Sequence, residues 1–329
     1  MRLDKYIKRI YKNKDLWNYY DKEFKRIDLS DALSCKKFIT KYVEYAKKNP
    51  DNLYKELLYL ENHDENRLKH IASTFFIGIL LYNCRELPFR RLICKELKEI
   101  EAFDNTNIDD HFIYIWFLIT LYHDLGYKYE KDNLDFNIND YDILDKNKNI
   151  NMVPTIYEDI YKKYINYHKN DHGICGGLIF NQEICKIRAR NENSSDSLNW
   201  DRKLQQVYES VAWIIVSHNI WWCREGDEIE KEYIEKGLNK LIIKKDSAYP
   251  IDIKNYPLFF MFCLVDTIEP SKRDIKHDKI DFKFNKNSIT IKCKTKNNIK
   301  KYLDGILDSK KWLTNIQSGK DSNEVTIDI

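Results

Sequence analysis

The chain has 329 residues, of which 43% are hydrophobic and 14% aromatic, a composition that excludes an intrinsically disordered protein. Lysine and arginine together number 55 and aspartate and glutamate 52. The resulting net charge of +3 excludes a whole-protein field that would attract nucleic acid or an acidic membrane surface.

The N-terminal stretch "MRLDKYIKRIYKNKD" is charged and lacks the apolar segment of a signal peptide. The longest apolar stretches, around 112–121 and 258–265, are shorter than the roughly 20 residues that span a bilayer. The eight cysteines are scattered without a CxxC pair, which indicates reduced and mostly buried thiols rather than a disulfide framework. We therefore expect a cytoplasmic protein that does not enter the membrane.

Helical periodicity dominates the first 270 or so residues, where glycine and proline are scarce. Polar, Asn-rich loops are expected at 132–154 and 190–200. The first follows "HDLGYK" directly, so it either covers a site or is a surface insertion. The predicted helices cover 3–12, 15–26, 31–48, 51–60, 66–84, 88–100, 110–124, 155–168, 172–188, 201–222 and 256–268.

After Pro270 the pattern changes. "DKIDFKFNKNSITIKCKTK" alternates apolar and polar residues on either side of "NKNS", which predicts a β-hairpin. "NNIKKYLDGILDSKKWL" predicts an amphipathic helix, and "EVTIDI" a last strand. The fold class is thus mainly α, a helical bundle with a small C-terminal α+β appendage. We place an N-terminal helical extension at 1–62, the central domain at 63–275 and the appendage at 276–329.

Polar side chains interrupt several of the apolar helical faces. His123 and Asp124 end the run "HFIYIWFLITLYHD", and His70 opens "HIASTFFIGILL". His218 falls on the apolar face of the preceding helix, and Asp266 follows the apolar face of "PLFFMFCLVD". Each histidine alone is more often a satisfied core residue than a ligand. A buried carboxylate, however, needs an arginine, a lysine or a metal as its partner.

A further histidine, His172, begins another apolar helix. Asp171 before it is a suitable N-cap, and Gly176 and Gly177 permit close approach of another helix. Imidazoles and carboxylates without thiolates suit Fe, Mn, Zn or Mg rather than a cysteine-type structural zinc site. Six such ligands are enough for two divalent ions bridged by a carboxylate.

The ordered set of motifs resembles the dinuclear branch of the HD-domain superfamily of metal-dependent phosphohydrolases, over roughly 65–275. "HDLGY", "DHGICGGLI" and "DTIEPSKR" resemble local segments of that family. The resemblance implies an HD-type helical bundle whose first metal site is formed by His70, His123, Asp124 and Asp266. It also implies that Asp124 bridges to a second ion, which His172 and His218 would complete.

Two other His-Asp pairs, His63-Asp64 and His277-Asp278, lie in polar stretches and are interpreted as surface residues. The chain also departs from named branches of the superfamily. "LGYK" follows the His-Asp pair where guanosine tetraphosphate hydrolases carry acidic residues. Lys128 is one position later than the lysine of the cyclic-di-GMP branch, and the "GYP" signature is absent. The diadenosine tetraphosphate branch, which "DTIEP" resembles, consists of much shorter proteins, so no substrate is transferred from it.

The resemblance implies that a metal-activated hydroxide attacks a phosphomonoester or phosphodiester, of a nucleotide or another phosphorylated small molecule. The catalytic residues would be His123, Asp124 and Lys128. Basic side chains near the motifs are candidate phosphate ligands, although such residues are more often surface charges, and Arg273 could instead pair with Glu269. These candidates are Arg67, Lys128, Lys272 and Arg273.

Two alternatives stay open. The HD scaffold also holds di-iron sites, so the protein could be an oxygenase resembling myo-inositol oxygenase. It could also be a non-catalytic regulatory domain that binds a nucleotide and signals through its appendage. The sequence leaves the metal, the substrate and homo-oligomer formation undecided.

Overall fold

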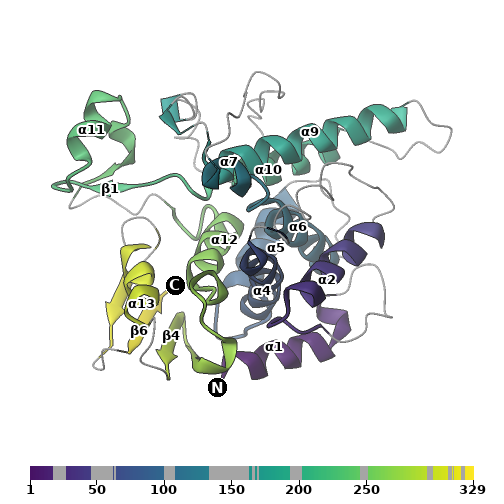
Figure 1. Ribbon diagram of the computed structural model, residues 1–329, viewed down its shortest axis with the longest axis horizontal. Coiled ribbons are helices and arrows are strands. Elements are labelled where there is room, and N and C mark those ends of the chain that lie inside the picture. Colours follow the sequence, from purple (N-terminus) through teal and green to yellow (C-terminus); the bar gives the residue numbers. More distant parts are fainter. Residues whose placement is uncertain are drawn as a thin grey trace.

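The structure is a computed structural model, and it confirms the predicted fold class, mainly α with a small C-terminal α+β appendage (Figure 1). It describes residues 1–17, 27–45, 62, 64–99, 108–132, 163–164, 167–168, 170–192, 202–244, 251–294, 299–309, 313, 315–319 and 323–329. The predicted helices at 51–60 and, for the most part, 15–26 and 155–168 lie outside these residues. So do nearly all of the two predicted loops.

The described helices are α1 (Leu3–Lys12), α2 (Ala32–Tyr45), α4 (Glu65–Tyr82), α5 (Phe89–Glu99), α6 (Ile108–Tyr122), α7 (Tyr127–Lys131), α9 (His172–Glu192), α10 (Arg202–Ser217), α11 (Glu230–Glu235), α12 (Pro257–Ile268) and α13 (Ile299–Asp308). The strands are β1 (Cys223–Arg224), β2 (Ile242–Ile243), β3 (Ile280–Asn285), β4 (Ser288–Cys293), β5 (Asn315–Ser318) and β6 (Glu324–Asp328). Short 3-10 turns lie at Lys14–Leu16, Asn239–Leu241, Ser271–Arg273 and His277–Lys279.

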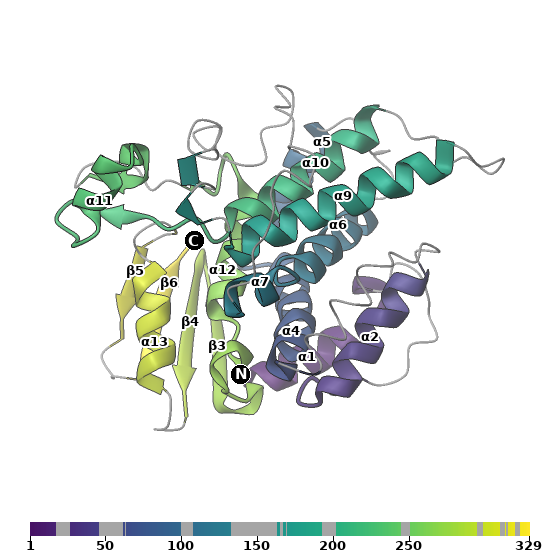
Figure 2. The same ribbon diagram turned by 45° about the horizontal axis from the view of Figure 1, so that its top comes forward.

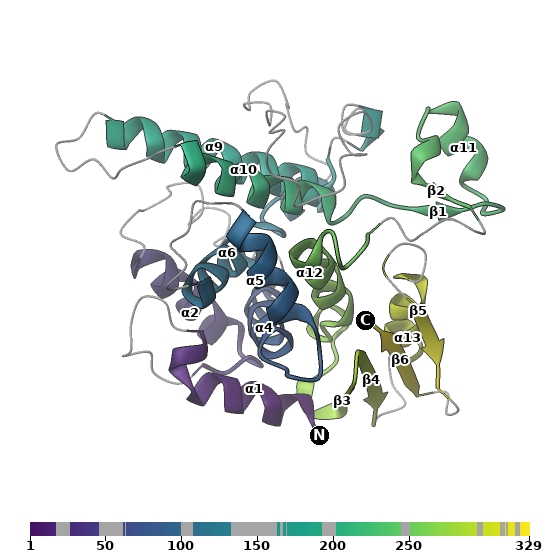
Figure 3. The same cartoon turned by 180° about the vertical axis from the view of Figure 1, so that it is seen from behind.

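Helix α4 lies at the centre of the bundle, between α1, α2, α5, α6 and α12 (Figures 2 and 3). Every residue of α4 from His70 to its end is buried, and most of α6 and α12 is buried too. A helix that is apolar all round is stable only inside a protein, which explains this placement. Polar residues in the buried part of α4, such as His70 and Ser73, therefore face other helices rather than water.

Helices α9 and α10 pack side by side across one end of this bundle (Figure 2). The predicted close approach at the glycines of α9 is confirmed. A Cβ atom at Gly176 would lie 2.6 Å from the Tyr122 carbonyl oxygen, and one at Gly177 2.9 Å from the Ala212 carbonyl oxygen. Gly176 therefore sets how closely the start of α9 approaches the end of α6.

Replacing Gly176 by alanine should destabilise the protein by about 1–3 kcal/mol, because the added methyl group meets backbone that cannot move cheaply. Urea denaturation of wild type and variant measures this difference. An unchanged unfolding midpoint would show that α9 and the end of α6 are less tightly apposed than the structure indicates.

Helix α12 begins beside a carboxylate supplied by α5. The backbone N–H of Leu258 donates to Glu96 Oε2 over 3.1 Å, and Glu96 Oε1 is buried without a hydrogen-bond partner among the described residues. Burial raises the pKa of Glu96 well above its ordinary value, although the Leu258 hydrogen bond opposes the shift. Glu96 is thus an N-terminal cap of α12 that is costly to ionise.

Replacing Glu96 by glutamine should stabilise the protein more at pH 8 than at pH 5. A carboxyl whose pKa is raised on folding stabilises the fold below its unfolded pKa and loses that contribution as the pH rises through the folded value. Glutamine keeps an oxygen acceptor for Leu258 but has no charge to desolvate. Urea titrations measure the free energy of unfolding of wild type and variant at both pH values. An equal difference in this free energy at pH 5 and pH 8 would refute the prediction.

The C-terminal appendage is a four-stranded antiparallel sheet in the order β3-β4-β6-β5, with α13 packed against it (Figures 1 and 2). The predicted hairpin pairs β3 with β4 around a turn in which Asn287 has φ 55°. The predicted helix and last strand correspond to α13 and β6. The boundary at 275/276 stays a prediction. Contacts cross it, because Phe282 exchanges backbone hydrogen bonds with Met1 and α1 packs on β3.

Several elements differ from the expectations, among them α7 and β5, which were not predicted. The helix predicted at 201–222 ends at Ser217, because a turn in which Ile220 N–H donates to the Ser217 carbonyl replaces the last helical turn. The segment after it contains β1, β2 and α11, which lie at the edge of the molecule apart from the bundle (Figures 1 and 3). These two-residue strands are too short to give a periodic pattern. No helix in the described part of the chain is both long and apolar enough to cross a membrane.

Candidate metal centre

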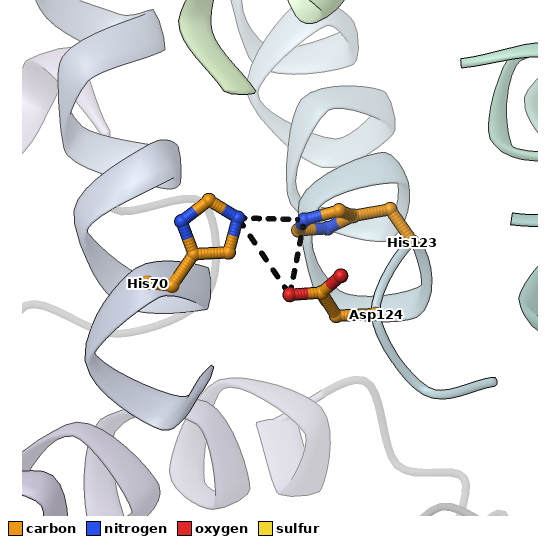
Figure 4. A group of neighbouring side chains, drawn as sticks. All are labelled: His70, His123 and Asp124. Atoms are coloured by element: carbon orange, nitrogen blue, oxygen red, sulfur yellow. Dashed lines mark hydrogen bonds and ion pairs between the residues drawn. The ribbon is translucent and has the colours of Figure 1, made fainter. Parts of the chain in front are cut away.

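His123 and Asp124 lie in the turn that follows α6, and they face His70 of α4 (Figure 4). All three side chains are fully buried. The Nε2 atoms of His70 and His123 are 3.1 Å apart, and each is 3.6 Å from Asp124 Oδ2. These three residues form one cluster of side chains that could hold a metal ion.

Asp266, near the end of α12, lies beside this cluster. Its Oδ1 lies 2.9 Å from His70 Nε2 and 3.6 Å from His123 Nε2. Two ligands bound to one ion at about 2.1 Å lie roughly 3.0 Å apart at a right angle and roughly 3.4 Å apart at a tetrahedral angle. The spacings in this cluster are therefore close to those around a single bound cation.

His172 and His218 lie on the other side of Asp124. His172 Nε2 is 3.6 Å from Asp124 Oδ1, and the ring centroids of the two histidines are 5.2 Å apart. Within the described residues, Asp124 Oδ1, His172 Nε2 and His218 Nε2 are all buried without a hydrogen-bond partner. Buried polar atoms are seldom left unsatisfied, so these three are candidate ligand atoms for a metal ion.

The other nitrogen of each imidazole is held by an oxygen acceptor. His123 Nδ1 lies 2.8 Å from the Thr120 carbonyl, and His218 Nδ1 lies 2.6 Å from the Ile215 carbonyl. His70 Nδ1 lies 2.7 Å from Glu269 Oε2, and His172 Nδ1 makes a short contact with a Glu130 oxygen. An acceptor at Nδ1 favours the proton on that nitrogen, so Nε2 would be the atom available to a metal ion in each case.

Local structure explains two of these four anchors. His123 and His218 each follow the last residue of a helix, α6 and α10, where carbonyl groups lack a partner within the helix. The Nδ1 atom of each imidazole lies within hydrogen-bond distance of one such carbonyl, three residues earlier in the chain. A histidine just past a helix end is therefore oriented by the helix itself.

The other two anchors, Glu269 and Glu130, were not among the predicted site residues. Glu269 is fully buried, and it also accepts hydrogen bonds from Ser271 and from the backbone of Lys272. A carboxylate three residues after Asp266 was the available signal, but it was interpreted as a candidate partner of Arg273. Glu130 lies in the charged segment "YKYEK", which resembles an ordinary surface helix.

The electrostatics of Asp124 and His218 suit a cation site, whereas at His70 and His172 burial is outweighed by hydrogen-bonded carboxylates, which raise the pKa of both imidazoles. Burial alone would raise the pKa of Asp124, but Arg67 and the neighbouring histidines outweigh it and hold that pKa well below its usual range. Burial, with His172 beside it, lowers the pKa of His218 to about 3. The carboxylate is therefore ionised and His218 neutral at physiological pH, which are the forms that bind metal ions.

Two of the predicted basic residues lie at the cluster. Arg67 Nη1 donates to Asp124 Oδ2 over 2.9 Å, and the guanidinium lies over the Tyr127 ring, 3.7 Å from its centroid. Lys272 Nζ is 3.1 Å from both oxygens of Asp266. Both cations are only partly exposed, with 12% and 24% of the side chain accessible.

The other two predicted basic residues are placed differently. Arg273 donates to the Thr267 carbonyl over 3.3 Å, and its guanidinium lies over the Tyr302 ring of α13, so it points toward the appendage. The Lys128 ammonium lies 4.8 Å from the Tyr129 ring centroid. The proposed roles of both residues toward phosphate, and the catalytic role of Lys128, stay predictions.

The interpretation of His277 as a surface residue was wrong. Its side chain is only 11% exposed. Its Nε2 atom lies 2.6 Å from Ser73 Oγ and 3.5 Å from a Glu269 oxygen. Residues 276–279 look polar in sequence, but they fold back against α4, which buries the imidazole. His277 thus supports Glu269, the anchor of His70. His63 lies outside the described residues.

A second cluster, of Glu130, Asp171 and His172, also has ligand atoms close together. The predicted N-cap role of Asp171 is consistent with the structure, since its Oδ1 accepts the backbone N–H groups of Gly173 and Ile174. Its Oδ2 accepts from Asn219 over 2.6 Å. Because both Asp171 oxygens already accept hydrogen bonds, this cluster is better suited to orienting His172 than to binding an ion.

The described residues therefore contain a buried group of histidines and aspartates that could hold metal ions, in an arrangement compatible with an HD-type site. Comparisons with protein-family models, with curated proteins and with solved structures found no match for this chain. What supports the resemblance is the order of the motifs together with the geometry of the cluster.

Proposed function

We propose that the protein is an HD-type, metal-dependent phosphohydrolase that cleaves a phosphate ester of a nucleotide or a similar small molecule. The observation that carries this proposal is the gathering of four buried histidines and two aspartates beside an arginine and a lysine. Residues His70, His123, Asp124 and Asp266 would hold one divalent ion. Asp124, His172 and His218 would hold a second.

Divalent ions held there would lower the pKa of a water molecule and neutralise phosphoryl oxygens, the chemistry that phosphate ester hydrolysis needs. The protein's own groups complement that chemistry. Asp124 offers Oδ2 to one half of the site and Oδ1 to the other, so one carboxylate serves both. Glu269 and Glu130 keep the imidazoles oriented, so that the site needs little rearrangement.

Arg67 and Lys272 distinguish a phosphate site from a bare metal site. Both hydrogen-bond to a candidate ligand carboxylate and both keep some exposed surface. A substrate phosphate beside Asp124 and Asp266 would find a guanidinium and an ammonium already in place. The Tyr127 ring under Arg67 holds the guanidinium plane, which favours a bidentate contact.

The test is elemental analysis of the purified protein, followed by a phosphate-release screen over mono-, cyclic and dinucleotides with Mn²⁺ under anaerobic conditions. We expect metal in the purified protein and phosphate release from at least one substrate. Oxygen consumption with a mixed-valent iron signal, and no phosphate release, would favour the di-iron oxygenase instead. Thermal stabilisation by one nucleotide without any turnover would favour a regulatory domain.

A further inference from the structure

A cavity lies at the end of α4 opposite the metal centre. It has a volume of about 640 Å³, which falls within the range of small-molecule sites. Its lining includes Arg85, Arg90 and Arg91 and an apolar side formed in part by Leu16 and Leu87. Tyr82, which also lines it, follows His70 by 12 residues on the same helix, which places it about 18 Å away. The cavity is therefore separate from the site described above.

The positive charge at this cavity is only partly matched. Arg90 pairs with Asp109 at 2.5 Å, and Asp109 also accepts the Tyr82 hydroxyl at 2.7 Å. Arg85 and Arg91 have no side-chain hydrogen bond or ion pair in the part of the chain that the structure describes. Two exposed arginines therefore line the cavity. Arg85 acts electrostatically on the neighbouring Glu86, and Arg91 has no ion pair among the described residues.

The helix that carries two of these arginines adds to the positive potential. Arg90 and Arg91 lie in the first turn of α5, and that turn contains no acidic residue. The N-terminus of a helix carries a partial positive charge, so arginines there are unfavourable unless an anion lies near them. Asp109 supplies such an anion to Arg90, whereas Arg91 has no ion pair among the described residues, so its placement favours an anionic ligand.

The loop between α4 and α5 is held in place before any ligand binds. The backbone N–H of Asn287, in the β3-β4 turn, donates to the Glu86 carbonyl over 3.1 Å. Asn83 donates to the Ile79 carbonyl over 2.9 Å, and Leu87 is buried. A pre-ordered loop loses little conformational entropy on binding, which favours a real site over a chance gathering of charges.

We propose that this cavity binds a small organic phosphate, with its phosphate on Arg85 and Arg91 and its apolar portion against Leu16 and Leu87. Guanidinium forks match phosphate oxygens in pairs, and the apolar side would take a ring or a hydrocarbon group. This site needs no metal ion and does not depend on the proposed hydrolysis.

The test is isothermal titration of the full chain, kept in a chelator, with phenyl phosphate and with inorganic phosphate as probes. We expect one phenyl phosphate per chain, bound more tightly than inorganic phosphate because of the apolar contact. Arg85→Glu and Arg91→Glu should each weaken binding at least tenfold, and Arg91→Lys should weaken it less. Lys231→Glu, an equal charge change on α11, which lies at the edge of the molecule and does not line the cavity, should bind within twofold of wild type.

Three results would overturn this proposal. They are absence of binding to the wild-type chain, unchanged binding in both glutamate variants, and loss of binding in Arg67→Met, which would place the anion at the metal centre. Thermal unfolding of each variant verifies that it is folded. If a glutamate variant does not fold, the corresponding Arg→Gln variant replaces it and should still bind more weakly than wild type.

Discussion

Replacing Asp124 by asparagine should remove bound metal and reduce phosphate release by at least about 10²–10³-fold, the loss expected from one preorganised electrostatic contact alone. The carboxylate offers one oxygen to His70 and His123 and the other to His172, so its loss affects both halves of the site. Metal content per chain and turnover with the best substrate of the screen are the two measurements.

This variant needs a test of folding, because Asp124 is fully buried and is hydrogen-bonded to Arg67. Removing one member of a buried pair can cost about 3–5 kcal/mol. His123→Ala, which leaves that pair intact, should lose metal and activity as well. His168→Ala, whose ring stacks on Tyr164 outside the cluster, is the matched histidine control and should retain both. Full turnover in a folded Asp124→Asn or His123→Ala variant would contradict the site assignment.

Replacing Glu269 by glutamine should weaken metal binding by about 10–100-fold, as is typical when the partner of a ligating histidine is lost. All the groups that face Glu269 either donate or can donate hydrogen bonds, namely His70, Ser271, the Lys272 backbone and His277. Glutamine would present an NH₂ group to one of these donors, so His70 would lose its fixed orientation. Titration of the metal-free protein with Mn²⁺ measures the change.

The effect should depend on which histidine loses its anchor. Glu269→Gln should weaken the ion held by His70, whereas Glu130→Gln should weaken an ion held by His172, whose Nδ1 it contacts. Asp278→Asn, a partly exposed carboxylate in the same C-terminal segment, should leave metal affinity unchanged. Equal affinity in wild type and Glu269→Gln would mean that His70 is oriented by some other group or is not a ligand.

Much of the fold could be predicted because periodicity reports burial directly. The apolar run of α6 predicts a buried helix. The alternation of apolar and polar residues in β3 and β4 predicts a hairpin, and the appendage was identified from it. The end of α10 was placed too late, because the apolar residues Ile220 and Trp222 continue the pattern into a segment that is no longer helical. Apolar residues indicate burial but do not fix where a helix stops.

The candidate ligands could be predicted because a histidine or aspartate on an apolar face is conspicuous. Glu269, Glu130 and His277 could not, because they lie in segments that are polar in sequence and are buried or engaged only through tertiary contacts. Glu269 becomes fully buried where the chain turns after α12 against α4. The arginine-lined cavity was missed for a related reason, since it forms only where α4, α5 and the residue Leu16 meet.

Anomalous diffraction from crystals of the protein soaked in Mn²⁺ tests the central claim most directly. The account predicts an ion about 2.0–2.2 Å from the Nε2 atoms of His70 and His123, and a second beside those of His172 and His218, with Asp124 between them. Bound Mn²⁺ only at the Glu130–Asp171 cluster, or no anomalous peak among the four imidazoles, would contradict it.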